Sequence, residues 1–368
     1  MSAPRPSRVL GIDVARGLAS AIMIQGHAYD GWVRADQKTT ASYLFTRVLG
    51  TLPLPSFLLL AGAAIALRLE AADVKRERPR GVRAALVRRG LFVFAVGYVV
   101  NAVSALMDGF EGLETFFRVD VLQTIGLSIV LIAGLGVGER EGRIDRRRLW
   151  LAAIALSIVP VAICPPVSAA LWGTPAPASY LAGLVSYVAP VTRMPLVPLS
   201  AWAGIGLVLS LGLIEANRSL RSMAGAPDRV LVALLAAGLG VAWLGTQAEG
   251  WVTAWTGVPL DQRSWAVVPN AIELAARGVV VLATGALLTP RLLSVIREGL
   301  ARLGRGSLVA YVFHVPFCYG SLGRPIEGQL DMPTATFFVV LLEVASYLAV
   351  VARDRWMQAR QARSAAAA

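Results

Sequence analysis

Ten apolar segments of membrane-spanning length recur along this chain of 368 residues, with mostly short polar connections between them. About 20 apolar residues cross the hydrocarbon core as a helix, because lipid offers the backbone no hydrogen-bonding partner. The sequence therefore predicts an all-α protein, a polytopic transmembrane helix bundle of about ten spans. The predicted spans lie near residues 10–29, 41–67, 84–106, 119–137, 149–166, 196–214, 230–247, 266–288, 304–320 and 333–352.

No connection between the segments is long enough for a folded soluble domain. We predict a cytoplasmic N-terminal tail at residues 1–7, a single transmembrane domain at 8–353 and a cytoplasmic C-terminal tail at 354–368. The tail after about Gln361 is expected to be disordered. The first apolar segment is long and no clear small-residue cleavage site follows it, so we expect no cleavable signal.

The basic residues sort by side of the membrane. Of the 35 lysines and arginines, 26 lie in the tails and connections of one side, and seven lie on the other. This is the positive-inside pattern, which predicts cytoplasmic termini and a multi-pass protein of the cytoplasmic (inner) membrane. The net charge of +12 then mostly reports topology, so we expect membrane lipids and no nucleic acid as partners. A nucleotide-bearing ligand at the basic cytoplasmic face stays open.

The first segment carries three residues that are costly in hydrocarbon: Asp13, Arg16 and His27. Arg16 and His27 are eleven residues apart, so at about 100° per residue they share a helix face, about 16 Å apart along the axis. Asp13 lies three residues before Arg16, within reach of an ion pair. One interpretation is a snorkelling arginine held by Asp13, with a histidine at the outer interface. Together on one face, the residues favour an internal polar track.

Three further segments carry polar groups. His314, the second of two histidines, precedes Pro316, and it is either a hydrogen-bonded residue at a kink or a second acid–base group. Glu273 and Arg277 are four residues apart, a spacing that favours an ion pair within one helix. Glu343 has no partner nearby in the sequence, and an intramembrane carboxyl is a functional-site candidate by default.

The fourth segment begins "FFRVDVLQTIGLS", which places Arg118 and Asp120 at the outer surface and Gln123 one turn further in. A capped helix start explains Asp120, because a carboxylate is favourable in the first turn. Two cysteines and two histidines far apart in sequence give no zinc spacing, so we expect no metal. We expect Cys164 and Cys318 to be free, buried thiols.

Two outer connections carry apolar groups. The stretch "SYLAGLVSYVA", near residues 179–189, is too short to cross and predicts an interfacial or re-entrant segment. The tryptophans Trp251, Trp255 and Trp265 favour an interfacial belt, and a stacking platform for sugars is the alternative.

The motif "IDVARGLASAIMIQGHA" resembles the first catalytic helix of the transmembrane acyltransferase superfamily. Arg16 and His27, with ten residues between them, are similar to the acyltransferase-3 pattern of a basic residue, ten positions and a histidine. The segments "LPSFLLLAGAAIAL", "RRGLFVFAVGY", "FFRVDVLQTIGLS" and "LGRGSLVAYVFHVPFCYG" resemble the heparan-α-glucosaminide N-acetyltransferase-like branch. These matches spread over most of the chain.

The resemblance implies a membrane acyltransferase that takes acetyl-CoA or another acyl-CoA from the cytoplasm and modifies a hydroxyl or amine of an extracytoplasmic glycan or glycolipid. His27 would be the essential histidine, as general base or acyl carrier, and Arg16 would line the donor channel. Asp120 and His314 would join the catalytic group, and Arg118 and Gln123 the donor site.

Two other functions compete with the enzyme. One is a transporter or exporter of a glycan or lipid that uses the charged pairs Asp13–Arg16 and Glu273–Arg277, together with Glu343, as coupling groups. It predicts repeat symmetry between the two halves, which the sequence does not display. The other is a non-catalytic assembly partner. A homodimer is left open.

Overall fold

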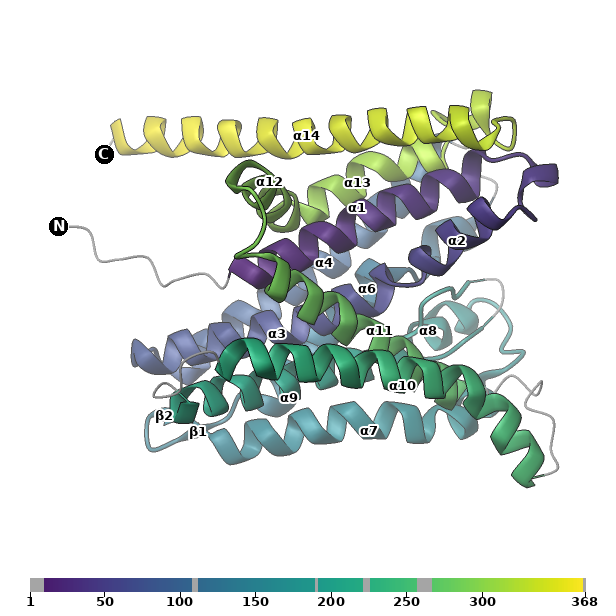
Figure 1. Ribbon diagram of the computed structural model, residues 1–368. Helices are drawn as coiled ribbons and strands as arrows, with labels where there is room; N and C mark the ends of the chain where they lie inside the picture. The colour runs from purple at the N-terminus through teal and green to yellow at the C-terminus, as the bar shows by residue number, and fades with distance from the viewer. Residues whose placement is uncertain (1–9, 108–111, 189–190, 221–225, 257–266, 367–368) are drawn as a thin grey trace. The chain divides into compact units, whose positions relative to one another are not determined.

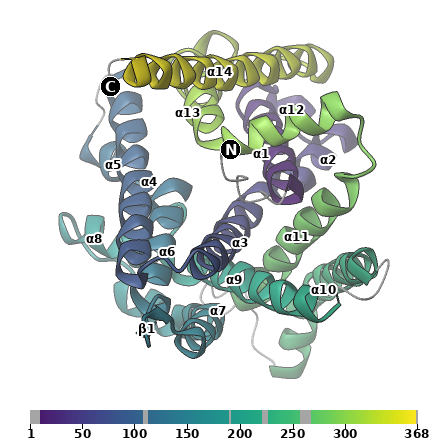
Figure 2. The same ribbon diagram turned by 90° about the vertical axis from the view of Figure 1, so that its left-hand side faces the viewer.

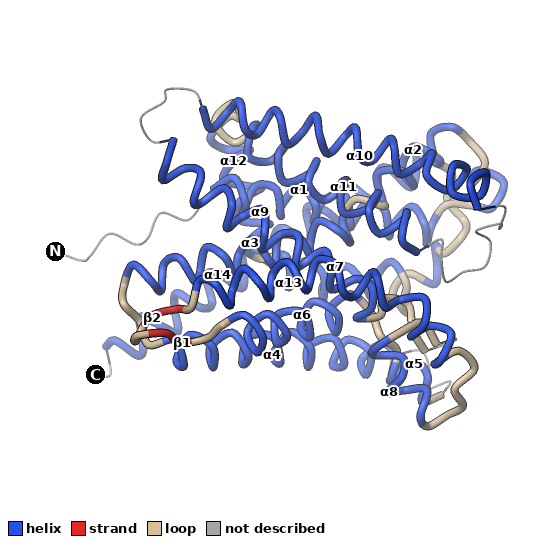
Figure 3. Tube along the Cα trace, turned by 90° about the horizontal axis from the view of Figure 1, so that it is seen from below, coloured by secondary structure: helices blue, strands red, loops and turns tan. Residues whose placement is uncertain are grey.

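A computed structural model describes residues 10–107, 112–188, 191–220, 226–256 and 267–366, and it is helical nearly throughout. The two strands in this part are β1 (Glu139–Arg140) and β2 (Arg143–Ile144), an antiparallel hairpin drawn in red in Figure 3. The all-α prediction is therefore confirmed. The structure divides into two compact units: one contains Leu54–Ala283 and the other contains Val9–Pro53 with Thr284–Ala368. The predicted single domain at 8–353 stays a prediction.

The first unit contains the long helices of the middle of the chain. Within it, α4 packs on α6, α7 packs on α9, and α6 also contacts α7 and α9. The helices are α3 (Pro53–Val74), α4 (Pro79–Met107), α5 (Leu113–Phe117), α6 (Val121–Gly136), α7 (Arg146–Leu171), α8 (Ala178–Val185), α9 (Leu196–Leu220), α10 (Ala226–Thr256) and most of α11 (Val267–Leu288). Figure 2 labels α5, and Figure 1 labels the others.

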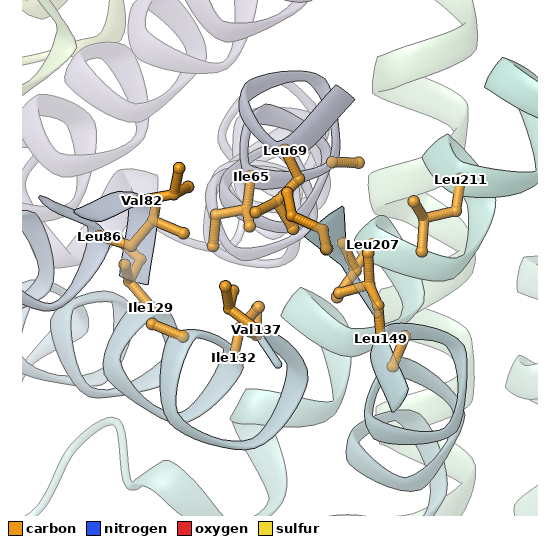
Figure 4. Close-up of a cluster of buried hydrophobic side chains, with 14 of the residues drawn as sticks. Ile65, Leu69, Val82, Leu86, Ile129, Ile132, Val137, Leu149, Leu207 and Leu211 are labelled. Atoms are coloured by element: carbon orange, nitrogen blue, oxygen red, sulfur yellow. The ribbon is translucent and has the colours of Figure 1, made fainter. Parts of the chain in front are cut away.

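The core of the first unit is a cluster of branched aliphatic side chains (Figure 4). The cluster joins α3, α4, α6, α7 and α9, and van der Waals contact between these side chains stabilises the packing of the helices within a membrane. The residues labelled in the figure are Ile65, Leu69, Val82, Leu86, Ile129, Ile132, Val137, Leu149, Leu207 and Leu211.

The second unit brings the two ends of the chain together around α1 (Leu10–Trp32). This helix contacts α2 (Ala41–Gly50), α12 (Ser294–Arg305), α13 (Ser307–Cys318) and α14 (Met332–Ala366). Figure 1 and Figure 2 show α13 and α14 beside α1. Two 3₁₀ turns complete the unit, η1 (Ala35–Gln37) and η2 (Arg324–Ile326).

The crossing of α1 and α12 depends on two glycines. A Cβ atom on Gly17 would collide with the carbonyl oxygen of Leu300, and one on Gly304 would collide with that of Asp13. The two backbones therefore meet without intervening side chains. This contact fixes the N-terminal half of α1 against α12.

Six stretches of the described chain are long and apolar enough to cross a membrane: Ala41–Val74, which joins α2 and α3, and Pro79–Met107, Arg146–Leu171, Leu196–Ala216, Asp228–Gln247 and Met332–Ser364. The helices at Val121–Gly136 and Ser307–Cys318 are apolar but shorter. A multi-pass membrane protein follows from this composition. The count of about ten spans and the cytoplasmic termini stay predictions.

Several element boundaries differ from the sequence-based ones. The segment predicted as one span at 41–67 is two helices, because Pro53 disfavours helical geometry at the residue before it. The segment at 304–320 starts in the last turn of α12 and continues as α13 after Gly306. Beyond Gln361, where disorder was expected, α14 continues to Ala366. The N-terminal tail at 1–7 lies outside the described residues.

The β1–β2 hairpin was not predicted. Glu141 and Gly142 both have positive φ, 54° and 74°, as a tight two-residue hairpin turn requires. By contrast, the helix α8 has eight residues and is too short to cross a membrane, as the sequence predicted. Its interfacial or re-entrant position stays a prediction. The tryptophans Trp251, Trp255 and Trp265 lie outside the residues whose side chains are described.

Candidate active site

The two histidines of the chain meet in the second unit. His27 on α1 and His314 on α13 are 287 residues apart in sequence, and His27 Nδ1 lies 2.9 Å from His314 Nε2. Their rings are stacked, with centroids 5.1 Å apart and planes 21° from parallel. The sequence left open whether these residues make contact, and the fold brings them together.

A backbone carbonyl assigns the protons in this pair. His314 Nδ1 lies 2.8 Å from the carbonyl oxygen of Ala310, which only accepts hydrogen bonds, so Nδ1 carries the proton. In neutral His314 the other nitrogen, Nε2, is then the acceptor, and His27 Nδ1 donates to it. Neutral His27 is left with a lone pair on Nε2. The two hydrogen bonds, from His314 to Ala310 and from His27 to His314, thus orient one basic nitrogen, Nε2 of His27.

The two histidine rings differ in how far they are buried. His314 is fully buried, and Tyr311 packs edge-on against it with ring centroids 5.7 Å apart. His27 is partly exposed, and its ring centroid is 5.2 Å from that of Tyr319. His27 is therefore the more exposed of the two rings, and the buried His314 is its hydrogen-bond partner.

A polar cluster that the sequence analysis missed lies one turn beyond His27. Tyr319 donates its hydroxyl to Asp30 Oδ2 at 3.2 Å, and Tyr43 donates to Asp30 Oδ1 at 3.4 Å. Arg47 Nη1 lies 3.0 Å from Asp30 Oδ1. The available signal was the three-residue spacing of His27 and Asp30, which puts both on neighbouring positions of one helix face.

The inner end of the predicted track is also built into α1. Asp13 is buried, and its Oδ2 lies 3.6 Å from Arg305 Nη1, on α12. Arg16 is partly exposed, and its carbonyl oxygen accepts a 2.8 Å hydrogen bond from Ser20 Oγ. Because α1 is helical from Leu10 to Trp32, Arg16 and His27 share its face about 16 Å apart along the axis.

The Arg118 segment is part of the first unit, whereas His27 belongs to the second. Arg118 Nε lies 3.2 Å from Asp120 Oδ2, and Asp120 forms a capping box with the buried Gln123 at the start of α6. Asn101 and Gln123 both donate to the Arg118 carbonyl oxygen, at 2.6 Å and 3.3 Å. The capped helix start is confirmed. A role of these side chains in one site with His27 stays a prediction.

The remaining predicted residues fall outside the histidine pair. Glu273 and Arg277 form the expected ion pair within α11. Glu343 lies on α14, partly exposed, and makes no hydrogen bond or ion pair with any residue that the structure describes. Cys164 and Cys318 are free, buried thiols, as predicted. Among the described residues no group of three His, Cys, Asp or Glu could hold a metal ion.

Comparison with known proteins assigns this sequence to a family. Residues 8–242 match the family described as heparan-alpha-glucosaminide N-acetyltransferase, catalytic. No curated protein matched the chain. The predicted relation to acyltransferase-3 proteins stays a prediction, and His314 lies beyond the matched residues. The match includes α1 with Arg16 and His27 and covers more than half of the sequence, so this multi-pass membrane protein belongs to the heparan-α-glucosaminide N-acetyltransferase family, as an acetyltransferase that acts on glycans.

Proposed function

We propose that this protein moves an acyl group, acetyl in the first instance, from cytoplasmic acyl-CoA to a hydroxyl or amine of a glycan or glycolipid across the inner membrane. The observation that carries the proposal is the His27–His314 pair. Its hydrogen bonds leave the lone pair of His27 Nε2 directed away from His314 and available to a reacting group.

The chemistry follows from that lone pair. His27 Nε2 takes the proton of the acceptor while the acceptor atom attacks the thioester carbonyl, the C–S bond breaks, and the proton passes to the departing CoA sulfur. His27 Nδ1 donates to His314 throughout, so the imidazolium that forms between the two proton transfers keeps a neutral acceptor beside it. In the alternative route His27 Nε2 carries the acyl group itself, and the same hydrogen bonds orient it.

The donor would approach from the cytoplasmic end of α1. The slender pantetheine arm can follow the face from Arg16 to His27, about 16 Å, while the charged nucleotide stays at the basic connections. We assign Arg16, Arg118 and Gln123 to the donor and Asp120 with His314 to support of the catalytic group. We expect membrane lipids to surround the protein. Whether it forms a homodimer is left open.

The direct test is acyl transfer by the purified full-length protein. With radiolabelled acetyl-CoA and a panel of cell-envelope glycans and amino sugars, we expect labelled product that the His27→Ala protein does not form. Equal labelling by both proteins would show that His27 is not the reactive group. Glycan transport by reconstituted protein without any labelled product would favour the transporter.

A second expected result concerns donor binding. Arg16→Ala should weaken acetyl-CoA binding about 10- to 100-fold, because a charge-assisted hydrogen bond contributes about 1.5–3 kcal/mol. Isothermal titration or filter binding measures the dissociation constant. His27→Ala and Arg363→Ala, at the exposed end of α14, should both bind like wild type. Unchanged binding by Arg16→Ala would remove Arg16 from the donor path.

A further inference from the structure

The helix α12 lies across α1 in the second unit. Figure 1 shows α12 nearly end-on and α1 lengthwise, and the close backbone approaches at Gly17 and Gly304 mark the crossing. With 12 residues α12 is about 18 Å long, which is too short to span a bilayer. This length and this crossing suit a helix that lies along the membrane interface.

The face of α12 that points away from α1 is exposed and carries both apolar and basic groups. Leu300 and Gly304 lie on the opposite face, where the backbone meets α1. At about 100° per residue, four exposed side chains fall within an arc of about 80°. They are Val295, Glu298, Arg302 and Arg305.

The exposed apolar side chains gather where α12 begins. Leu293 and Val295 are 73% and 80% exposed, and Ile296 is 49% exposed. Three large apolar side chains are unfavourable in water, whereas acyl chains at a membrane interface cover them. The exposed Arg302 and Arg305 follow about two turns later on the same helix.

The arginines outnumber the carboxylates on α12 itself. From the turn before the helix to its last residue, the described chain has one carboxylate, Glu298, and four arginines. The arginines are Arg291, Arg297, Arg302 and Arg305. This segment therefore has a net charge of +3.

The helices packed against α12 do not reverse that charge. Asp13 of α1 lies 3.6 Å from Arg305, and Arg16 follows it one turn later. On α14, Asp354 lies 3.9 Å from Arg302 and 3.1 Å from Arg353, and Arg355 comes next in the sequence. The helix α13 has no arginine, lysine or carboxylate. Together these groups are seven arginines and three carboxylates, a net charge of +4.

Phosphate is the anion that such a surface recognises, because guanidinium groups pair with its oxygens through two parallel hydrogen bonds. Both an anionic phospholipid and the nucleotide of CoA carry phosphate. The exposed Leu293 and Val295 favour the lipid, since a nucleotide has no acyl chain to cover them.

We propose that the exposed face of α12 binds the headgroup of an anionic phospholipid, with Arg302 and Arg305 on the phosphate and with Leu293 and Val295 among the acyl chains. Because α12 meets the backbone of α1, a lipid held there stabilises the helix that carries His27. This site does not depend on the proposed acyl transfer.

Competition between two lipids tests the headgroup. The full-length protein in detergent is mixed with equal amounts of dioleoyl phosphatidylglycerol and dioleoyl phosphatidylcholine, and native mass spectrometry counts each bound lipid. We expect the wild type to bind the anionic lipid about 25-fold more, from about five-fold for each of two arginines. Arg302→Gln should lower the ratio about five-fold, and Arg302→Gln with Arg305→Gln should bring it close to one.

Matched variants separate charge from packing. Arg302→Lys keeps the charge and should keep the ratio, as should Arg363→Gln at the exposed end of α14. Glu298→Gln removes the carboxylate of the same face and should raise the ratio. Val295→Ser should lower the occupancy by both lipids and leave their ratio unchanged.

Monodisperse elution of each variant in detergent confirms that it is folded before the comparison. Equal binding of the two lipids by the wild type would overturn the proposal, and so would an unchanged ratio in folded Arg302→Gln and Glu298→Gln. Adenosine 3′,5′-bisphosphate, a soluble fragment of CoA, should not displace phosphatidylglycerol. Displacement that Arg302→Gln abolishes would identify a site for soluble phosphates in place of the lipid.

Discussion

Replacing His27 by alanine is expected to lower the rate of acyl transfer about 10²- to 10⁴-fold, the usual contribution of one general acid–base group. The loss should appear in kcat, with acetyl-CoA binding unchanged, because His27 Nε2 acts on the acceptor proton and not on the nucleotide. Single-turnover transfer from radiolabelled acetyl-CoA measures the chemical step directly. A His27→Ala protein that transfers label at the wild-type rate would exclude both routes proposed for this residue.

The partner histidine provides the matched control. His314→Phe keeps a buried ring on α13 but removes the acceptor for His27 Nδ1. We expect kcat to fall about 10- to 100-fold, less than for His27→Ala, with KM for both substrates unchanged. The double variant should be no slower than His27→Ala alone, because His314 acts only through His27. A further loss in the double variant would show that His314 contacts a substrate itself.

Helical periodicity was sufficient to predict that Arg16 and His27 share one face of α1. The eleven-residue spacing of Arg16 and His27 needs only a continuous helix, and α1 is continuous over both. Ion pairing of Glu273 with Arg277 and capping by Asp120 are local in the same sense. Such features depend on residues within one or two helical turns of each other, so they can be predicted from the spacing of residues in the sequence.

The histidine pair itself could not be derived in this way. Contact between His27 and His314 depends on how α13 packs against α1, and that packing involves residues nearly 300 positions apart. The sequence left open the rotation of each helix about its axis, and that rotation decides whether the two rings face each other. The same holds for Asp30 and Tyr319, which come from α1 and the end of α13.

Helix boundaries that depend on a single proline or glycine could also be predicted in part. Pro53 and Gly306 each interrupt an apolar run that a hydropathy window joins into one span. The interruptions need the backbone preferences of proline and glycine as well as mean hydropathy. The tight hairpin at Glu141–Gly142 carries the same kind of local signal, an acidic residue followed by glycine between two short strands.

Substitution of Gly304 by alanine is expected to destabilise the second unit by about 1–3 kcal/mol, because its Cβ collides with the carbonyl oxygen of Asp13 on α1. Backbone atoms cannot rotate away as a side chain would, so α12 must move from α1 and the Asp13–Arg305 ion pair must lengthen. By the scaling for domains of this size, the apparent melting temperature in detergent should fall by about 2–12 °C.

Gly299, on the same helix, is the matched control. No atom lies within 4 Å of the position that its Cβ would occupy, so alanine there adds no collision. Alanine also favours helix over glycine by about 1 kcal/mol, and the Gly299→Ala protein should melt at or above the wild-type temperature. Because α12 supports the helix that carries both Arg16 and His27, Gly304→Ala should lose acetyl-CoA binding and transfer together, whereas His27→Ala loses transfer alone. Equal melting temperatures for the two alanine variants would show that α1 and α12 are not in backbone contact.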